Sequence, residues 1–187
     1  MILTQGVKVN DLLLGDKNAV MVAARILAYG AEYPASIIHP KTGDTIDVTF
    51  DLTNCPFKEI PEDLNEKSFE FELPISKTKV SYKLLTGKDE DDITIELRRI
   101  NKINKGPSPE ITTRMRYMIQ SVDGDSTQAT INSFSQNILA RDSLALRKEI
   151  KRVSPDIIMN QEIEIGGEMV TVKIPMTTNF FWPQTKA

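Results

Sequence analysis

The feature that most constrains this chain is a change in the period of its apolar residues, which occurs twice. Up to about residue 87, apolar and polar residues largely alternate, as in a strand with one buried face. Residues 88–154 place apolar residues three or four apart, which is typical of helices, and alternation returns near residue 160. Strands and helices are therefore segregated, which predicts an α+β fold with two β-hairpins flanking a helical middle.

One helix is expected before the first hairpin, over residues 16–29. Gly30 stands where a C-terminal glycine cap falls, and Pro34 is expected to stop helical continuation. The apolar stripe of this helix is expected at Val20, Ala23, Ala24 and Leu27.

The two expected hairpins share one layout. The first spans residues 35–52, with a glycine-containing turn at 41–44, and the second spans 161–174, with Gly166-Gly167 at its turn. Each has a strand, a turn and an alternating strand, which is consistent with a degenerate repeat. Two further strands are expected at 68–76 and 80–85.

Three helical stretches are expected in the middle. The first begins at Asp89, Glu90, Asp91 and Asp92 and ends in basic residues, an order that complements the helix dipole. The second spans 109–122, with Ser108 as its cap, and its stripe is Ile111, Met115, Met118 and Val122. The third spans 126–153, either as one helix or as two that meet near Arg141-Asp142.

The length of 187 residues suits a single domain in three consecutive parts. These are residues 1–87 (the first helix and the β-rich part), 88–154 (the helical part) and 155–187 (the second hairpin and an aromatic tail). The net charge of −3 comes from interspersed signs, so no nucleic-acid partner is expected. No apolar run approaches the roughly 20 residues that span a bilayer, so no membrane anchor is expected. The N-terminus also lacks the pattern of a signal peptide, and synthesis and folding in a cytoplasm are expected.

The residues that could carry chemistry are few. Cys55 is the single cysteine and His39 the single histidine, so four typical zinc ligands cannot be assembled from them. A Cys55–His39 nucleophile and base would lack an orienting third group. The acidic run 89–92 lacks the glycine and the distal glutamate of an EF-hand loop. The sequence therefore predicts no catalytic residue, no metal, no cofactor and no enzymatic activity.

Two groups of residues are candidates for protein–protein contact. Phe180, Phe181 and Trp182 lie near the chain end, where aromatic side chains either dock on the body or face a partner. Met115 and Met118 lie on one helical stripe, where they form either core or an adaptable partner surface.

Three segments resemble one family in their order and spacing: GDKNAVMVAARILAYGAEYP, RDSLALRKEIKRVSPDI and IPMTTNFFWP. They are similar to the baseplate hub subunit or hub assembly protein of T4-like contractile-tailed phages. The resemblance implies a virion or assembly role in the central baseplate hub. It implies other baseplate or tail-hub proteins as partners, and a location in the tail baseplate and, during assembly, in the host cytoplasm.

The chain departs from that family at its two turns. Many members carry a zinc-knuckle-like Cys-Pro-x-Cys-Gly turn, whereas here His39-Pro40-Lys41-Thr42-Gly43 and Ile165-Gly166-Gly167 stand at these positions. Zinc is therefore not carried over, and hydrogen bonding and packing must hold the turns. Two alternatives stay open: an assembly chaperone or adaptor that is absent from the mature virion and, less favoured, an enzyme that uses Cys55 or the 89–92 cluster.

Overall fold

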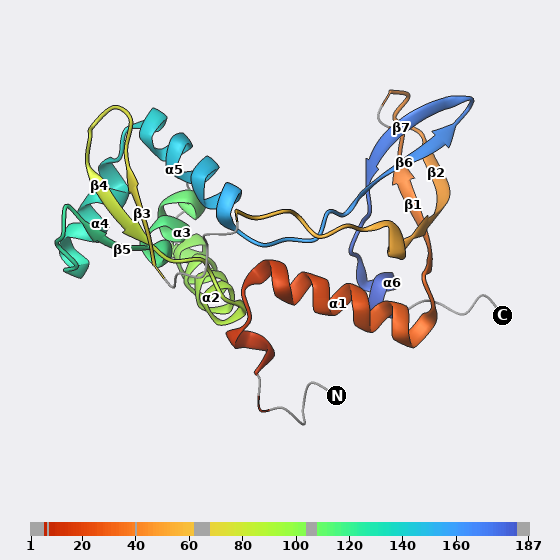
Figure 1. Ribbon diagram of the computed structural model, residues 1–187, viewed down its shortest axis with the longest axis horizontal. Helices are drawn as coiled ribbons and strands as arrows, with labels where there is room; N and C mark the ends of the chain where they lie inside the picture. The colour runs from red at the N-terminus through yellow and green to blue at the C-terminus, as the bar shows by residue number, and fades with distance from the viewer. Residues whose placement is uncertain (1–5, 7, 40, 62–67, 104–107, 183–187) are drawn as a thin grey trace. The chain divides into compact units, whose positions relative to one another are not determined.

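The computed structural model describes residues 6, 8–39, 41–61, 68–103 and 108–182 (Figure 1). It has mixed helices and small antiparallel sheets, so the α+β prediction with hairpins is confirmed. Contacts group the chain into two compact units, each discontinuous in sequence. Unit 1 is Met1–Lys17 with Glu59–Pro155, and unit 2 is Asn18–Lys58 with Asp156–Ala187. The expectation of three consecutive parts did not anticipate this interleaving.

In its described residues, unit 1 combines helices α2 to α5 with a three-stranded antiparallel sheet of order β3-β4-β5. The strands are β3 (Phe69–Glu72), β4 (Lys79–Tyr82) and β5 (Ile119–Val122), and the helices are α2 (Gly87–Ile103), α3 (Glu110–Met118), α4 (Gln128–Asn137) and α5 (Ala140–Val153). A short 3₁₀ helix, η2 (Val9–Asp11), also belongs to this unit. Its core includes Leu73, Val80, Tyr82, Ile93, Met115 and Leu146.

Strand β5 corrects the prediction of one helix over 109–122. The helix ends at Met118, and Ile119, Ser121 and Val122 of the following edge strand pair with β4. The hydroxyl groups of Ser81 and Ser121 lie 2.6 Å apart across this pair. Apolar residues at 118, 119 and 122 fit either a helical stripe or a short strand, so the partner strand decided the outcome.

Two other boundaries in the helical middle differ from expectation. Ser108 does not cap α3, because Pro109 occupies the N-cap position and no side chain bonds there. The stretch 126–153 is two helices, which was one of the two predicted alternatives, and they divide at Ile138 and Leu139, just before the predicted Arg141-Asp142. Asp142 lies in the first turn of α5, where its buried carboxylate holds the β3–β4 turn.

Unit 2 contains the two predicted hairpins. They are β1 (Glu32–Ile38) with β2 (Thr45–Asp51), and β6 (Asn160–Ile165) with β7 (Glu168–Lys173), both antiparallel. Pro34 lies within β1, opposite Thr49, so the proline follows the helix as expected but is part of the strand. Gly166 and Gly167 both have positive φ values, which a two-residue hairpin turn requires and glycine adopts without strain.

The two hairpins of unit 2 lie side by side and share one core (Figure 1). The side chain of Gln161 in β6 bonds to both backbone groups of Asp51, at the end of β2. Its amide donates to the carbonyl of Asp51, and its side-chain oxygen accepts the Asp51 N–H at 3.2 Å. At the hairpin turns, Lys41 forms an ion pair with Glu168. The hairpins are thus joined by hydrogen bonds at their open ends and by an ion pair at their turns.

Helix α1 (Leu14–Tyr29) agrees closely with the predicted span 16–29, but its expected stripe is wrong. Ala23, Ala24 and Leu27 are exposed, whereas Val22 and Arg25 are buried. The face that packs on the hairpins is offset, because Ala19, Val22 and Ile26 are the residues that contact the hairpin core.

Candidate interaction surface

The aromatic segment near the end of the described chain is anchored by Phe180. This residue lies in the short helix α6 (Thr178–Phe181), and its side chain is fully buried in unit 2. Its ring meets Tyr33 edge to face at a centroid distance of 5.0 Å and contacts Phe181 in the same way. Phe180 therefore docks on its own chain, which was one of the two outcomes expected from the sequence.

Tyr33 of β1 contacts this segment through both its hydroxyl and its ring. Its hydroxyl donates a hydrogen bond to the carbonyl of Pro175 at 2.9 Å, and its ring stacks against Phe50 of β2 at 6.5 Å. A tyrosine is well suited to this position because its ring fills the core while its hydroxyl satisfies a backbone carbonyl. The segment is thus held at Pro175, before α6, and at Phe180, within α6.

Trp182 differs from its two aromatic neighbours. Its side chain is 71% exposed, although its backbone N–H donates to the carbonyl of Thr178 at 3.0 Å. Phe181, which is half-buried, lies between the two extremes and contacts both neighbouring rings. The segment therefore presents one large indole to solvent from a backbone that is held in place. Pro183, the last residue of the aromatic segment that the sequence singled out, lies outside the described residues.

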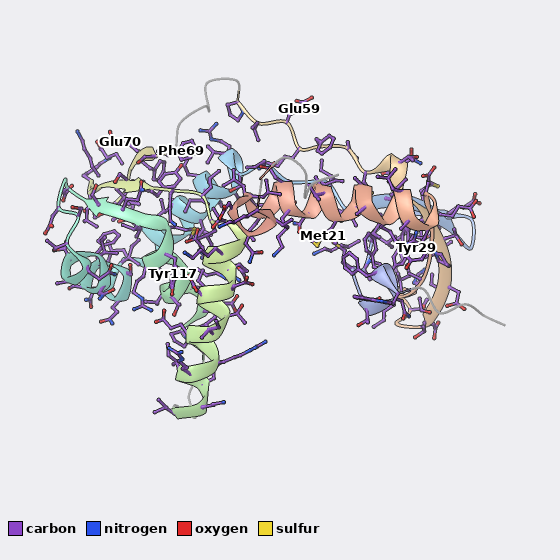
Figure 2. All side chains as sticks on the ribbon, turned by 90° about the horizontal axis from the view of Figure 1, so that it is seen from below. Met21, Tyr29, Glu59, Phe69, Glu70 and Tyr117 are labelled. Atoms are coloured by element: carbon purple, nitrogen blue, oxygen red, sulfur yellow. The ribbon has the colours of Figure 1, made fainter. Side chains whose placement is uncertain are left out.

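A buried arginine extends the aromatic contacts to helix α1. The Arg25 guanidinium donates to the carbonyls of Gly30 and Glu32 at 3.1 and 3.3 Å. It lies 4.9 Å from the ring of Tyr29 and 5.8 Å from the ring of Tyr33, distances at which cation–π attraction operates. Tyr29, labelled in Figure 2, is about half exposed on the last turn of α1. Ring and cation contacts therefore run from Trp182 through the buried aromatics to Tyr29.

Sequence reasoning missed Arg25, Tyr29 and Tyr33. The signal that could have found the first pair is their i, i+4 spacing, which places an arginine and a tyrosine on one face of a helix. Tyr33 precedes the predicted hairpin and carried no prediction of its own. Its bond to Pro175, 142 positions later, has no local signature in the sequence.

Met115 and Met118 are not part of any surface. Both are buried in the core of unit 1, which agrees with the core alternative and removes them from the candidate interface. The Ser143 hydroxyl lies 4.0 Å from the Met115 sulfur inside this core.

Cys55 and His39 have separate structural environments. Burial is the main cause that raises the pKa of the Cys55 thiol, which disfavours the thiolate that a nucleophile needs. The His39 Nδ1 accepts the backbone N–H groups of Lys41 and Thr42 at 3.2 and 3.1 Å, so the imidazole supports the β1–β2 turn.

The acidic run opens helix α2 as a cap. Thr86 and Asp89 bond each other reciprocally, with the Thr86 N–H donating to the carboxylate and the Thr86 hydroxyl accepting the Asp89 N–H. Burial by itself would raise the pKa of Asp89, but bonds from Lys83 and Thr86 outweigh it and lower the pKa. Within the described ranges, no three His, Cys, Asp or Glu side chains are grouped to hold a metal ion.

Comparisons with known proteins add no relative: no family model, no curated protein and no solved structure matches this chain. Among the helices that the structure describes, none is long and apolar enough to cross a membrane.

Proposed function

We propose that the chain is a structural or assembly component of the central baseplate hub of a contractile phage tail, and that it acts through protein–protein contacts. The resemblance of three sequence segments to the hub family supports the class of function. The exposed Trp182 on an anchored backbone supports the mode of action.

The exposure of Trp182 is the observation that best supports a protein–protein contact. An indole held in water on a fixed backbone loses little conformational entropy when a partner covers it. Tryptophan is also enriched among the residues that dominate interface energies. Covering one large apolar side chain contributes roughly 1.5–3 kcal/mol at about 25 cal/mol per Å².

The test compares Trp182→Ala with a matched control, Phe57→Ala, in cells that produce the phage. Phe57 is the best control because it is also aromatic, is 72% exposed and belongs to the same unit. The expected result is that Trp182→Ala reduces co-purification with baseplate proteins and the yield of particles, whereas Phe57→Ala affects neither. Normal co-purification and yield with both variants would contradict the proposed contact.

A second measurement separates the two assembly roles. Mass spectrometry of purified virions is expected to detect the chain in the tail if it is a component of the hub. Its absence from virions, together with co-purification from infected cells, would favour the alternative of an assembly chaperone or adaptor. Normal particle production without the chain would contradict both roles.

A further inference from the structure

The acidic and basic residues of helix α2 differ in whether they form ion pairs. In its first half, Asp89 pairs with Lys83 at 2.7 Å and Glu90 pairs with Arg114 at 2.6 Å. Glu96 likewise forms an ion pair with Arg116 of α3. Three acidic residues of the helix are therefore paired with cations of their own unit, whereas Asp91 accepts a hydrogen bond from the Asn10 amide and Asp92 is exposed.

The second half of α2 is basic and unpaired. Arg98, Arg99 and Lys102 are exposed, and none of them forms an ion pair with another residue in the described part of the chain. In Figure 2 the last turns of α2 extend away from the rest of unit 1. The helix dipole accounts for cations at this end of α2, but not for the exposed isoleucines beside them.

Exposed apolar side chains accompany these cations. Ile95 is 47% exposed and Ile103 is 82% exposed. Arg98 and Lys102 are four positions apart and lie on one side of the helix, with Ile95 three positions before Arg98. The outer side of α2 is thus a mixed surface of cations and isoleucines, which we term the α2 face (Ile95, Arg98, Arg99, Lys102 and Ile103).

A complementary surface exists on unit 2. This unit contains eight acidic and five basic residues, a net charge of −3, whereas unit 1 has equal numbers of both signs. On the outer face of the β6–β7 hairpin, Glu162 and Glu164 are exposed and have no ion-pair partner among the described side chains. Met169, which is 64% exposed, stands directly opposite Glu164 in the register. We term these three residues the hairpin face.

The two faces also match in spacing. Residues two apart on a strand are about 6.8 Å apart, which applies to Glu162 and Glu164. Residues four apart on a helix are about 6 Å apart along the axis, which applies to Arg98 and Lys102. Two carboxylates can therefore meet two cations at once.

We infer that copies of this chain associate head to tail, with the α2 face of one copy on the hairpin face of the next. The contact joins two different surfaces, so it leaves a free face of each kind at the ends of every complex and extends unless a ring closes. Exposed ion pairs are weak and screened by salt, so we expect the association to need high protein concentration and to weaken as ionic strength rises. Such association takes effect where copies are concentrated by a larger assembly.

The experiment is sedimentation velocity of the full chain over a concentration series up to about 1 mM, at low and at high salt. Two charge-reversal variants are compared with the wild type: Arg98→Glu/Lys102→Glu on the α2 face and Glu162→Lys/Glu164→Lys on the hairpin face. Each substitution lies at an exposed position, and unchanged circular dichroism and melting temperature verify the fold of each variant.

The wild type is expected to form dimers and larger species with rising concentration, and to dissociate as salt increases. Each variant alone is expected to associate about tenfold more weakly, because like charges then face each other. An equimolar mixture of the two variants restores both charge matches and is expected to recover association. This rescue would not occur if either substitution only disturbed the fold.

Three outcomes would overturn the inference. They are a wild type that stays monomeric at the highest concentration, association that the reversals leave unchanged, and a mixture that fails to recover. If the wild type stays monomeric but binds a DNA duplex through Arg98 and Lys102, the α2 face serves nucleic acid instead. Because Trp182 is outside both faces, any of these results leaves the test of the proposed hub contact unaffected.

Discussion

The deep burial of Phe180 leads to a graded prediction for the stability of unit 2. Replacing a fully buried phenylalanine with alanine removes its apolar area and leaves a cavity, at a cost of about 3–5 kcal/mol. Unit 2 spans about 70 residues, and a unit of that size has a total stability of about 4–11 kcal/mol. Phe180→Ala is therefore expected to remove about a quarter or more of that stability.

The three aromatic residues form a series for the measurement. At about 4–8 °C per kcal/mol for a unit of this size, Phe180→Ala is expected to lower the melting temperature by about 12 °C or more. Phe181→Ala, which is half-buried, should have an intermediate effect, and Trp182→Ala should change stability by less than about 0.5 kcal/mol. Differential scanning calorimetry of the purified variants measures all three values.

The order of effects is the decisive result. If Phe180→Ala melted within about 4 °C of the wild type, α6 would not be docked as the ring contacts with Tyr33 indicate. If Trp182→Ala were the most damaging change, the indole would be buried and could not serve as the proposed contact.

Three further predictions concern other parts of the fold. Burial tends to raise the pKa of Asp142, but its bonds from the Ile75 and Ser76 N–H groups lower it, so Asp142→Asn should lose stability at neutral pH. Because this pKa is depressed, the advantage of the wild type should shrink as pH falls through the folded pKa, below about 3.8, which melting curves from pH 7 to 2 would show or refute. Cys55→Ser should leave particle production intact, and the buried thiol should react with iodoacetamide at pH 8 much faster after unfolding than before; equal rates would contradict its burial. Gly167→Ala places a side chain at φ +85°, so it should lower the melting temperature, and an unchanged melting temperature would argue against the turn.

The sequence predicted where the candidate surface lies, but not which of its aromatic side chains is exposed. A cluster of Phe180, Phe181 and Trp182 near the chain end indicated that something must cover those rings. The sequence did not show that Phe180 is buried and Trp182 exposed, because both belong to one short run of aromatic residues. The distinction depends on where Tyr33 lies after the hairpin β1–β2 has formed, which is a long-range property.

The sequence by itself determined the features that depend on neighbouring residues. Alternation over 45–52 and the Gly166-Gly167 turn specify hairpins, because side chains on a strand point to opposite faces in turn and positive φ values favour glycine. Helix-spaced apolar residues likewise specified α1, α2 and most of α5 to within a few positions. These elements follow from local geometry, and the α+β class follows from their order.

Only the tertiary structure decided the features that depend on residues far apart in the chain. Strand β5 exists because β4 offers an edge to residues that would otherwise continue a helix. The buried face of α1 includes Arg25 because the carbonyls of Gly30 and Glu32 and two tyrosine rings surround its guanidinium. The division into two interleaved units arises because residues 18–58 share a core with residues 156–182 and not with the segment between them. Such pairings arise from packing across long loops, and no periodicity within a single segment encodes them.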